Sequence, residues 1–170
     1  MRIFLAFFIL ITCFGCNKNK QQGLVYFNDF ENIKGWTDVL LDRKPVHSGS
    51  YSNRLDSINT YGETFKLSFK EISDHIIRKV KVKLWVFFPN KEAKGKFVIE
   101  INQPDKKNLF WIAKNIEELV KTPGEWTQIE MEFSFVNKDY MLPQNVIKIF
   151  PWNLNKQPFF VDDVRLEFII

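Results

Sequence analysis

The stretch Phe159-Phe160-Val161-Asp162-Asp163-Val164-Arg165-Leu166-Glu167-Phe168, near the end of the chain, decides the fold. Its second half alternates strictly, with Val164, Leu166 and Phe168 on one face and charged residues on the other. Such alternation is typical of a β-strand with one buried and one solvated face. By the same alternation Asp162 falls on the apolar side, where an unpaired carboxylate is costly to bury. We therefore expect Asp162 to have a cation, hydrogen-bond donors or a position at the rim.

The same alternation recurs along the chain and predicts further strands. Turn signals such as Asn90–Gly95 and Pro123-Gly124 separate these segments, and no long 3.6-residue pattern is present. Roughly nine to eleven short strands at this spacing predict an all-β fold, an antiparallel β-sandwich formed by one domain over residues 24–170. The predicted strands are residues 24–30, 36–41, 61–69, 76–88, 96–102, 109–114, 125–135, 145–152 and 159–170.

Composition and motifs limit the classes of function. Of the 170 residues, 45% are hydrophobic and 16% are aromatic, which favours a packed, strand-rich domain over a disordered chain. The net charge of +4 is spread thinly, so we expect no nucleic-acid partner. His47 and His75 are far apart, and no phosphate-binding loop, nucleophile elbow or metalloprotease helix is present. We expect a protein that is not an enzyme.

The first fifteen residues have the pattern of a lipoprotein signal peptide. Arg2 precedes the apolar run Ile3–Ile11, which is too short for a permanent transmembrane helix. Thr12-Cys13-Phe14-Gly15-Cys16 resembles a bacterial lipobox, although Cys13 stands where leucine is usual. An ordinary secretory signal or an N-terminal anchor helix is the alternative interpretation.

Both cysteines of the chain lie in this N-terminal segment, so the sequence excludes a disulfide in the mature domain. We expect residues 1–15 to be cleaved, Cys16 to carry the lipid, and residues 16–23 to form a polar tether. The predicted location is the cell envelope, with the lipid anchored in the outer membrane of a Gram-negative bacterium.

Carboxylates stand at both ends of the predicted domain. Asp29 and Glu31 close the first strand and Asp162 lies in the last, and the terminal strands of a sandwich commonly lie side by side. Together with carbonyl oxygens of the turn at Ser48, these groups would form the oxygen-rich site that Ca²⁺ prefers. The alternative is that the carboxylates cap turns or accept backbone hydrogen bonds. A β-bulge in the last strand would turn Asp163 inward instead of Asp162.

Aromatic side chains at outward positions are the second candidate site. Trp85 and Phe87 lie on the face of their strand opposite its core residues, and Trp111 and Trp152 are candidates for neighbouring positions. Aromatic planes on an open sheet face stack against the apolar C–H faces of sugar rings. Alternatively, these residues belong to the core, or they form a contact surface for a membrane or a protein partner.

Five segments carry a resemblance when they are taken in their order and spacing. They are Phe27-Asn28-Asp29-Phe30-Glu31, Gly35-Trp36, His47-Ser48-Gly49-Ser50-Tyr51-Ser52, Gly124-Glu125-Trp126-Thr127 and Phe160-Val161-Asp162-Asp163-Val164-Arg165-Leu166. Together they resemble the galactose-binding-like jelly rolls, and among these the carbohydrate-binding modules of families 4, 9 and 22. The resemblance implies a jelly-roll β-sandwich with a structural calcium ion near the chain ends, held by Glu31, the turn backbone at Ser48, and Asp162. The family's sugar-binding aromatic residues vary too much to be assigned by position.

Two hypotheses of function follow. The first is a lipid-anchored, non-catalytic envelope protein that binds a glycan through Trp85, Phe87, Trp111 and Trp152. The second is an envelope adhesion or interaction protein that uses the same sandwich to hold a protein partner.

Overall fold

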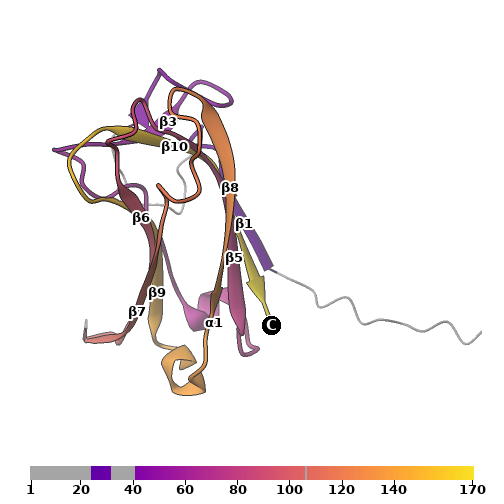
Figure 1. Ribbon diagram of the computed structural model, residues 1–170. Coiled ribbons are helices and arrows are strands. Elements are labelled where there is room, and N and C mark those ends of the chain that lie inside the picture. The colour runs from indigo at the N-terminus through magenta and orange to yellow at the C-terminus, as the bar shows by residue number, and fades with distance from the viewer. Residues whose placement is uncertain (1–23, 32–40, 106) are drawn as a thin grey trace, which may run out of the picture.

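Two antiparallel sheets packed face to face form the protein (Figure 1). The computed structural model describes residues 24–31, 41–105 and 107–170. The six-stranded sheet has the order β2-β3-β10-β5-β8, with β1 also paired to β10, and the four-stranded sheet has the order β4-β9-β6-β7. This arrangement confirms the predicted all-β antiparallel sandwich. The strands are β1 (Leu24–Asn28), β2 (Leu41–Asp42), β3 (Ser52–Leu55), β4 (Phe65–Ser68), β5 (Lys79–Phe87), β6 (Gly95–Asn102), β7 (Asn108–Asn115), β8 (Trp126–Ser134), β9 (Val146–Asn153) and β10 (Phe159–Ile169).

The predicted signal peptide, Cys16 and the tether lie outside the described residues, as does most of the predicted strand at 36–41. Within the part of the chain that the structure describes, no helix is both long enough and apolar enough to cross a membrane.

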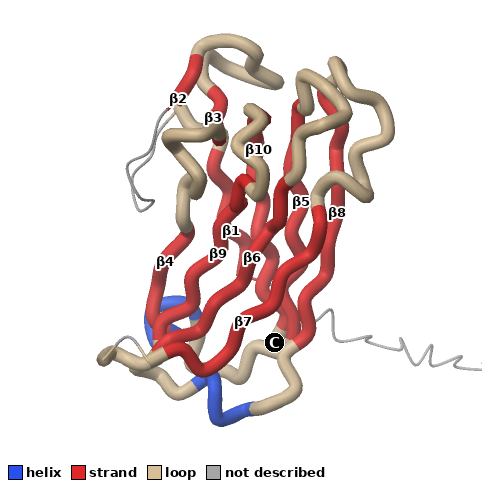
Figure 2. The backbone as a smooth tube through the Cα atoms, turned by 60° about the vertical axis from the view of Figure 1, so that its left-hand side comes forward, coloured by secondary structure: helices blue, strands red, loops and turns tan. Residues whose placement is uncertain are grey.

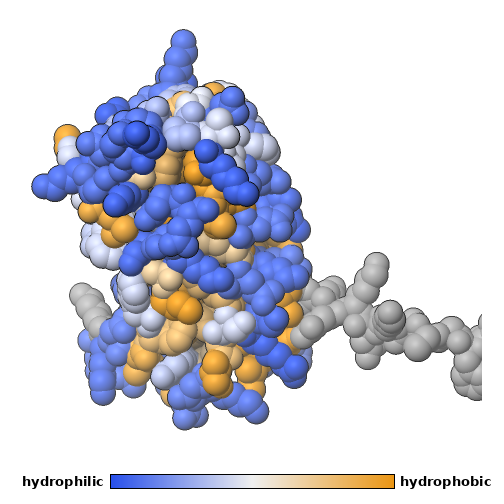
Figure 3. All heavy atoms as spheres, viewed as in Figure 1, coloured by the Kyte–Doolittle hydropathy of each residue, from blue (hydrophilic) through white to orange (hydrophobic). Residues whose placement is uncertain are grey.

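Side-chain alternation fills the space between the sheets. On β5, Val80, Val82, Leu84 and Val86 are buried, and the residues between them lie on the outer face of the sheet. Other strands add large apolar side chains to the same core, and burying each one stabilises the fold by about 1.5–3 kcal/mol relative to leaving it exposed. In the view of Figure 3, hydrophobic residues lie between the two sheets and hydrophilic residues surround them.

Strand β10 organises the six-stranded sheet because it changes partners along its length. Its first residues pair with β3 on one side, its later residues pair with β1 on that same side, and β5 lies along the other side. The terminal strands are therefore neighbours, as predicted. The register with β5 shifts between Asp162 and Arg165, which marks a β-bulge, and Asp163 there has a φ of 48°.

The bulge changes the direction of the acidic residues. Asp162 lies opposite Trp85, whose side chain is on the outer face of the sheet, whereas Val164 belongs to the core. The prediction that Asp162 shares the face of Val164 is therefore wrong, because the extra residue of the bulge interrupts the alternation. Asp162 is nevertheless fully buried, at 0% exposure, since residues 47 and 48 cover it from outside the sheet.

A short helix begins at the last residue of the strand predicted at residues 61–69. Strand β4 ends at Ser68, and α1 (Phe69–Ile72) follows it, while a 3₁₀ helix (Lys138–Met141) lies before β9. The Ser68 N–H donates to the Glu71 carboxylate at 2.8 Å, which is part of a capping box. The spacing of Ser68 and Glu71 is the sequence signal for this helix start, and alternation alone overlooked it.

Candidate functional site: an aromatic groove on the four-stranded sheet

A groove of about 480 Å³ lies on the outer face of the four-stranded sheet. Figure 2 presents this sheet at the front, with β4, β9, β6 and β7 side by side. Residues from three of its strands and from the segment before β4 line the groove: Tyr61, Thr64, Glu100, Trp111, Lys148, Phe150 and Trp152.

Strand register explains the shape of the groove. One row across the sheet consists of Phe150, Val98 and Ala113, which lie opposite one another on neighbouring strands. Val98 and Ala113 are small, so this row is low over β6 and β7. The rows on either side carry larger side chains. One contains Tyr61, Trp152 and Lys96, and the other contains Lys66, Lys148, Glu100 and Trp111. The two larger rows form walls, and the smaller row forms the floor.

Aromatic rings stand on both walls. On one wall, Tyr61 stacks on Trp152 with ring centroids 6.0 Å apart and an interplanar angle of 22°, and Tyr61 meets Phe150 edge to face. On the other wall, Trp111 is 47% exposed, and Tyr61 across from it is 56% exposed. Such exposure is unusual for large aromatic side chains and marks surfaces that bind a partner.

An ion pair crosses the wall that holds Trp111. Lys148 Nζ donates to Glu100 Oε1 at 2.8 Å, and the Asn102 amide donates to the same oxygen. Partial burial raises the pKa of Glu100, but these hydrogen bonds outweigh the burial and hold the pKa below its ordinary value. Glu100 is therefore a fixed carboxylate at neutral pH, and its second oxygen is left to accept a bond from a ligand hydroxyl.

The four aromatic residues predicted from the sequence fall into two places. Trp111 and Trp152 both line the groove, whereas Trp85 and Phe87 lie on β5, in the other sheet. The prediction that all four are neighbours is wrong. Alternation indicates which face of a strand a residue occupies, but it does not indicate to which sheet the strand belongs.

Trp85 and Phe87 have partners of their own. The ring of Trp85 stacks on His47 with centroids 3.7 Å apart and an interplanar angle of 15°. Phe87 lies 5.6 Å from Trp126 and 6.2 Å from Phe160, measured between ring centroids. Both side chains are half-buried, so they do not offer an open platform, and Trp85 supports the turn at His47.

Replacing Trp85 with alanine is expected to destabilise the protein and to leave the groove unchanged. Trp85 is half-buried beneath His47, so we expect a loss of about 2 kcal/mol, below the roughly 3–5 kcal/mol typical of fully buried aromatic residues. Urea unfolding measures this loss. The control is Phe27→Ala, because Phe27 is 54% exposed on β1 and its loss is expected to have little effect. A Trp85→Ala variant as stable as the control would contradict the supporting role.

The carboxylates predicted to hold calcium do converge on one turn. Glu31 Oε1 accepts hydrogen bonds from the backbone N–H groups of Ser50 at 2.6 Å and Tyr51 at 2.9 Å. Asp162 Oδ2 accepts from the N–H groups of the preceding two turn residues, His47 and Ser48, at 2.8 and 3.3 Å. The carboxylates of the first and last strands thus hold opposite ends of the turn.

Close packing fixes this turn in place. Gly49 lies between the two carboxylates with a φ of 61°, and a Cβ atom at Gly49 would come within 2.4 Å of Glu31 Oε1. Asp163 adds two further contacts, accepting from Ser48 Oγ at 2.9 Å and lying 2.7 Å from His47 Nδ1.

The turn meets the carboxylates of Glu31 and Asp162 with backbone N–H groups, which donate hydrogen bonds and do not ligate a cation. In residues 24–31, 41–105 and 107–170, no three or more His, Cys, Asp or Glu side chains are grouped as metal ligands require. The arrangement of Glu31, Ser48 and Asp162 therefore agrees with the alternative interpretation, in which the carboxylates accept backbone hydrogen bonds. Calcium binding stays a prediction, and its test is given in the Discussion.

Asp162 has a perturbed pKa. Its burial raises the pKa, and hydrogen bonds from the N–H groups of His47, Ser48 and Asp163 lower it, with a net rise to about 6. The neighbouring Asp163 carboxylate adds a smaller rise.

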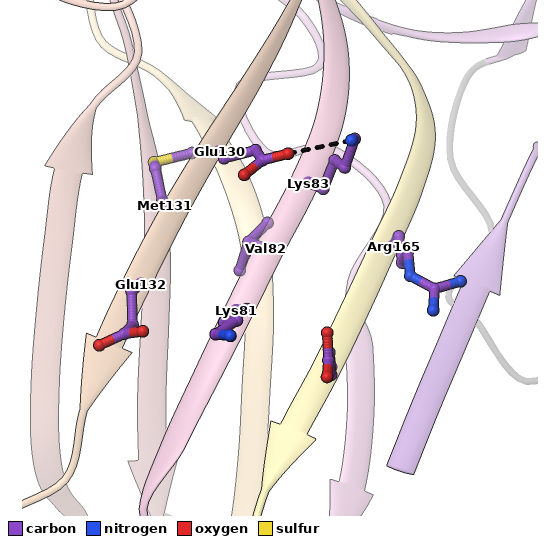
Figure 4. A pocket seen from close by; sticks show the side chains of 8 residues that line it. Lys81, Val82, Lys83, Glu130, Met131, Glu132 and Arg165 are labelled. Atoms are coloured by element: carbon purple, nitrogen blue, oxygen red, sulfur yellow. Dashed lines mark ion pairs between the residues drawn. The ribbon is translucent and has the colours of Figure 1, made fainter. Parts of the chain in front are cut away.

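The outer face of the six-stranded sheet offers a different surface. A hollow of about 330 Å³ is lined by residues of β5, β8 and β10 and contains no aromatic side chain (Figure 4). Half of the six charged residues in its lining take part in ion pairs. Lys83 lies 2.9 Å from Glu130. Glu132 lies 2.7 Å from Lys79, which is outside the lining. This surface lacks the planes that sugar rings stack on, so the groove is the better candidate site.

Solved structures show which fold this is. The CBM22-1 xylan-binding domain of Paenibacillus barcinonensis Xyn10C is similar with a TM-score of 0.58 and 14% identity, over 88% of this chain and 96% of that one. The CBM22-2 xylan-binding domain of the same protein gives 0.59 and 16%, over 84% and 98%. The fold is the jelly-roll β-sandwich of these domains. The C-terminal family 22 module of Clostridium thermocellum Xyn10B agrees, with 0.55 and 14%, over 85% and 92%.

This similarity confirms the predicted jelly-roll fold and the resemblance to family 22. No protein-family model matches the sequence, and no curated protein is similar to it. At 14–16% identity the solved structures establish the fold, and the assignment of function depends on the groove.

Proposed function

We propose that this protein is a non-catalytic carbohydrate-binding module, and that a glycan chain binds in the groove on the four-stranded sheet. The observation that carries the proposal is the placement of Trp111 and Trp152 on opposite walls of one groove, with Glu100 and Lys148 on the wall of Trp111. The xylan-binding domains that share the fold support it.

The groove has the two kinds of groups that sugar recognition needs. Trp111, Trp152 and Tyr61 offer aromatic planes for the apolar faces of sugar rings. Glu100 and Lys148 offer an acceptor and a donor for hydroxyl groups, which fix the orientation of a ligand. The groove crosses the strands along the row of Phe150 and Val98, so it suits an extended chain of sugars.

Titration of the full-length protein with soluble polysaccharides tests the proposal. We expect xylan or another extended glycan to bind, to quench tryptophan fluorescence and to release heat in calorimetry. Absence of binding to a panel of plant, fungal and bacterial polysaccharides would contradict it. Specific capture of an envelope protein by the same surface would then support the second hypothesis, an adhesion or interaction protein.

We also propose that Cys16 carries a lipid and holds the domain at the cell envelope, in the outer membrane of a Gram-negative bacterium. The sequence of residues 1–16 supports this proposal. The domain begins with β1, in the six-stranded sheet, whereas the groove opens on the outer face of the other sheet. An anchor before β1 would therefore leave the groove open to a glycan.

Replacing Cys16 with alanine is expected to abolish lipid labelling, because the Cys16 thiol is the proposed acyl acceptor. The precursor would also stay uncleaved before residue 16. Metabolic labelling with radioactive palmitate and the mass of the mature protein measure these two effects. Cys13→Ala is the matched control and is expected to be labelled normally, and labelling of the Cys16→Ala variant would contradict the anchor.

A further inference from the structure

The charges around the groove are unequal, and this observation extends the proposed function to a class of ligand. Register places Lys66 of β4 directly opposite Lys148 of β9, and Lys96 of β6 directly opposite Trp152. Against these three cations the outer face has one carboxylate in the same rows, Glu100, whose charge is already paired with Lys148. The two rows thus have a net positive charge, which comes from Lys66 and Lys96 beside the groove, since Lys148 and Glu100 in its lining balance one another.

Lys66 and Lys96 form no ion pair with any residue that the structure describes. The carboxylate of Glu117, near Lys96, accepts a hydrogen bond from the Gly95 N–H at 3.2 Å instead. Like charges directly opposite on neighbouring strands destabilise a sheet, so the Lys66–Lys148 pair has a cost that an anion would offset.

The other sheet makes a useful comparison because it also carries a row of lysines. There, Lys79 and Lys83 on β5 are each paired with a glutamate on β8, Glu132 and Glu130. Figure 4 shows the Lys83–Glu130 pair on this face. Lys81, between Lys79 and Lys83, forms no ion pair among the described residues, but register places it opposite Glu132 and Glu167. Lys66 and Lys96 have no carboxylate directly opposite, and this distinguishes the surroundings of the groove from the other outer face.

We propose that the groove is selective for a glycan that carries carboxylates, such as a polysaccharide with uronic acid residues. This inference rests on the proposed function. The aromatic rings of Trp111 and Trp152 take the sugar faces. The ammonium groups of Lys66 and Lys96, which lie in the same two rows beside the groove, take the carboxylates. Because exposed ion pairs contribute little and are screened by salt, the selectivity is expected to be modest and to depend on ionic strength.

The experiment compares two polymers that differ only in their carboxylates: glucuronoxylan and the same glucuronoxylan after chemical reduction of its carboxyl groups. Affinity electrophoresis or calorimetry with the full-length protein gives both affinities in about 20 mM and about 500 mM NaCl. We expect the acidic polymer to bind about five- to tenfold more tightly at low salt, and both to bind alike at high salt.

A double variant and a matched control assign the effect to the groove. Lys66→Gln with Lys96→Gln is expected to bind the reduced polymer as the wild type does and to lose the preference for the acidic one. Lys148 is kept, because its removal would leave Glu100 unpaired. The control, Lys79→Gln with Lys83→Gln on the other sheet, removes the same net charge and is expected to keep the preference.

The outcomes separate this inference from the function on which it rests. Equal affinity for the two polymers at low salt would overturn the acidic class and leave glycan binding in place. Loss of the preference in the control variant as well would show an effect of net charge alone, which also overturns the inference. Binding of neither polymer, and of no other glycan, would overturn the proposed function itself.

Discussion

Replacing Trp111 and Trp152 together with alanine is expected to reduce glycan affinity by about 10- to 100-fold. Stacking on each aromatic ring contributes about 0.5–1.5 kcal/mol beyond the burial of area, and 1.4 kcal/mol corresponds to a factor of ten in affinity. The two residues lie on opposite walls of the groove, so both losses fall on the same ligand. Titration of the wild type and the variant with the same polysaccharide measures the ratio.

Single variants separate the loss of a contact from the loss of the fold. Trp111 is 47% exposed, so Trp111→Ala is expected to weaken binding with little change in the free energy of unfolding. Trp152 stacks on Tyr61, so Trp152→Ala is expected to affect both. Trp85→Ala is the matched tryptophan control, because Trp85 lies on the other sheet, and its glycan affinity should equal that of the wild type. A double variant that binds as the wild type does would place the glycan elsewhere.

The sequence predicted the sandwich well because its long strands alternate without interruption. On β5, β8 and the second half of β10, every second residue is apolar and enters the core. Local hydrogen bonds decided the exceptions. The capping of α1 by Glu71 ended β4 early, and the bulge at Asp163 moved Asp162 to the outer face. Neither feature has a hydrophobic period that alternation can detect.

Two of the seven residues that line the candidate site were predicted from the sequence, and five were not. Trp111 and Trp152 were found because they are aromatic residues at outward positions. Tyr61 was missed because it lies before β4 and joins the sheet through a single bridge to Trp152. Glu100 and Lys148 were missed because charged outward residues are common, and only the strand order places these two beside Trp111.

The stability of the protein is expected to depend on the ionisation of Asp162. The folded-state pKa of Asp162 is raised from 3.8 to about 6, so folding favours its neutral form. The contribution of Asp162 to stability is therefore fully present below about pH 3.8 and is lost as the pH rises through about 6. One pKa unit corresponds to about 1.4 kcal/mol, so the wild type should lose about 2 kcal/mol between pH 4 and pH 7 on account of this group.

Comparison with Asp162→Asn isolates this effect from other acids. The pKa of Glu100, for example, is lowered, and its stabilising contribution is lost as the pH falls, which is the opposite slope. Urea unfolding of both proteins from pH 4 to pH 7 gives the difference in their free energies of unfolding. We expect the wild type to lose about 2 kcal/mol relative to the variant across this range. Asp163→Asn should keep most of the slope, because Asp163 is only a minor cause of the raised pKa.

The same measurement decides whether calcium is bound at the terminal carboxylates. A cation on Asp162 favours the ionised form, so bound calcium would reverse the slope and make the wild type more stable as the pH rises. At pH 7 a chelator would then lower the melting temperature, and added calcium would restore it. If the N–H groups of His47, Ser48 and Asp163 are the only partners of the carboxylate, the chelator changes nothing and the fall in stability from pH 4 to pH 7 remains. A slope that is the same in the wild type and in Asp162→Asn, with or without calcium, would contradict both accounts of this buried carboxylate.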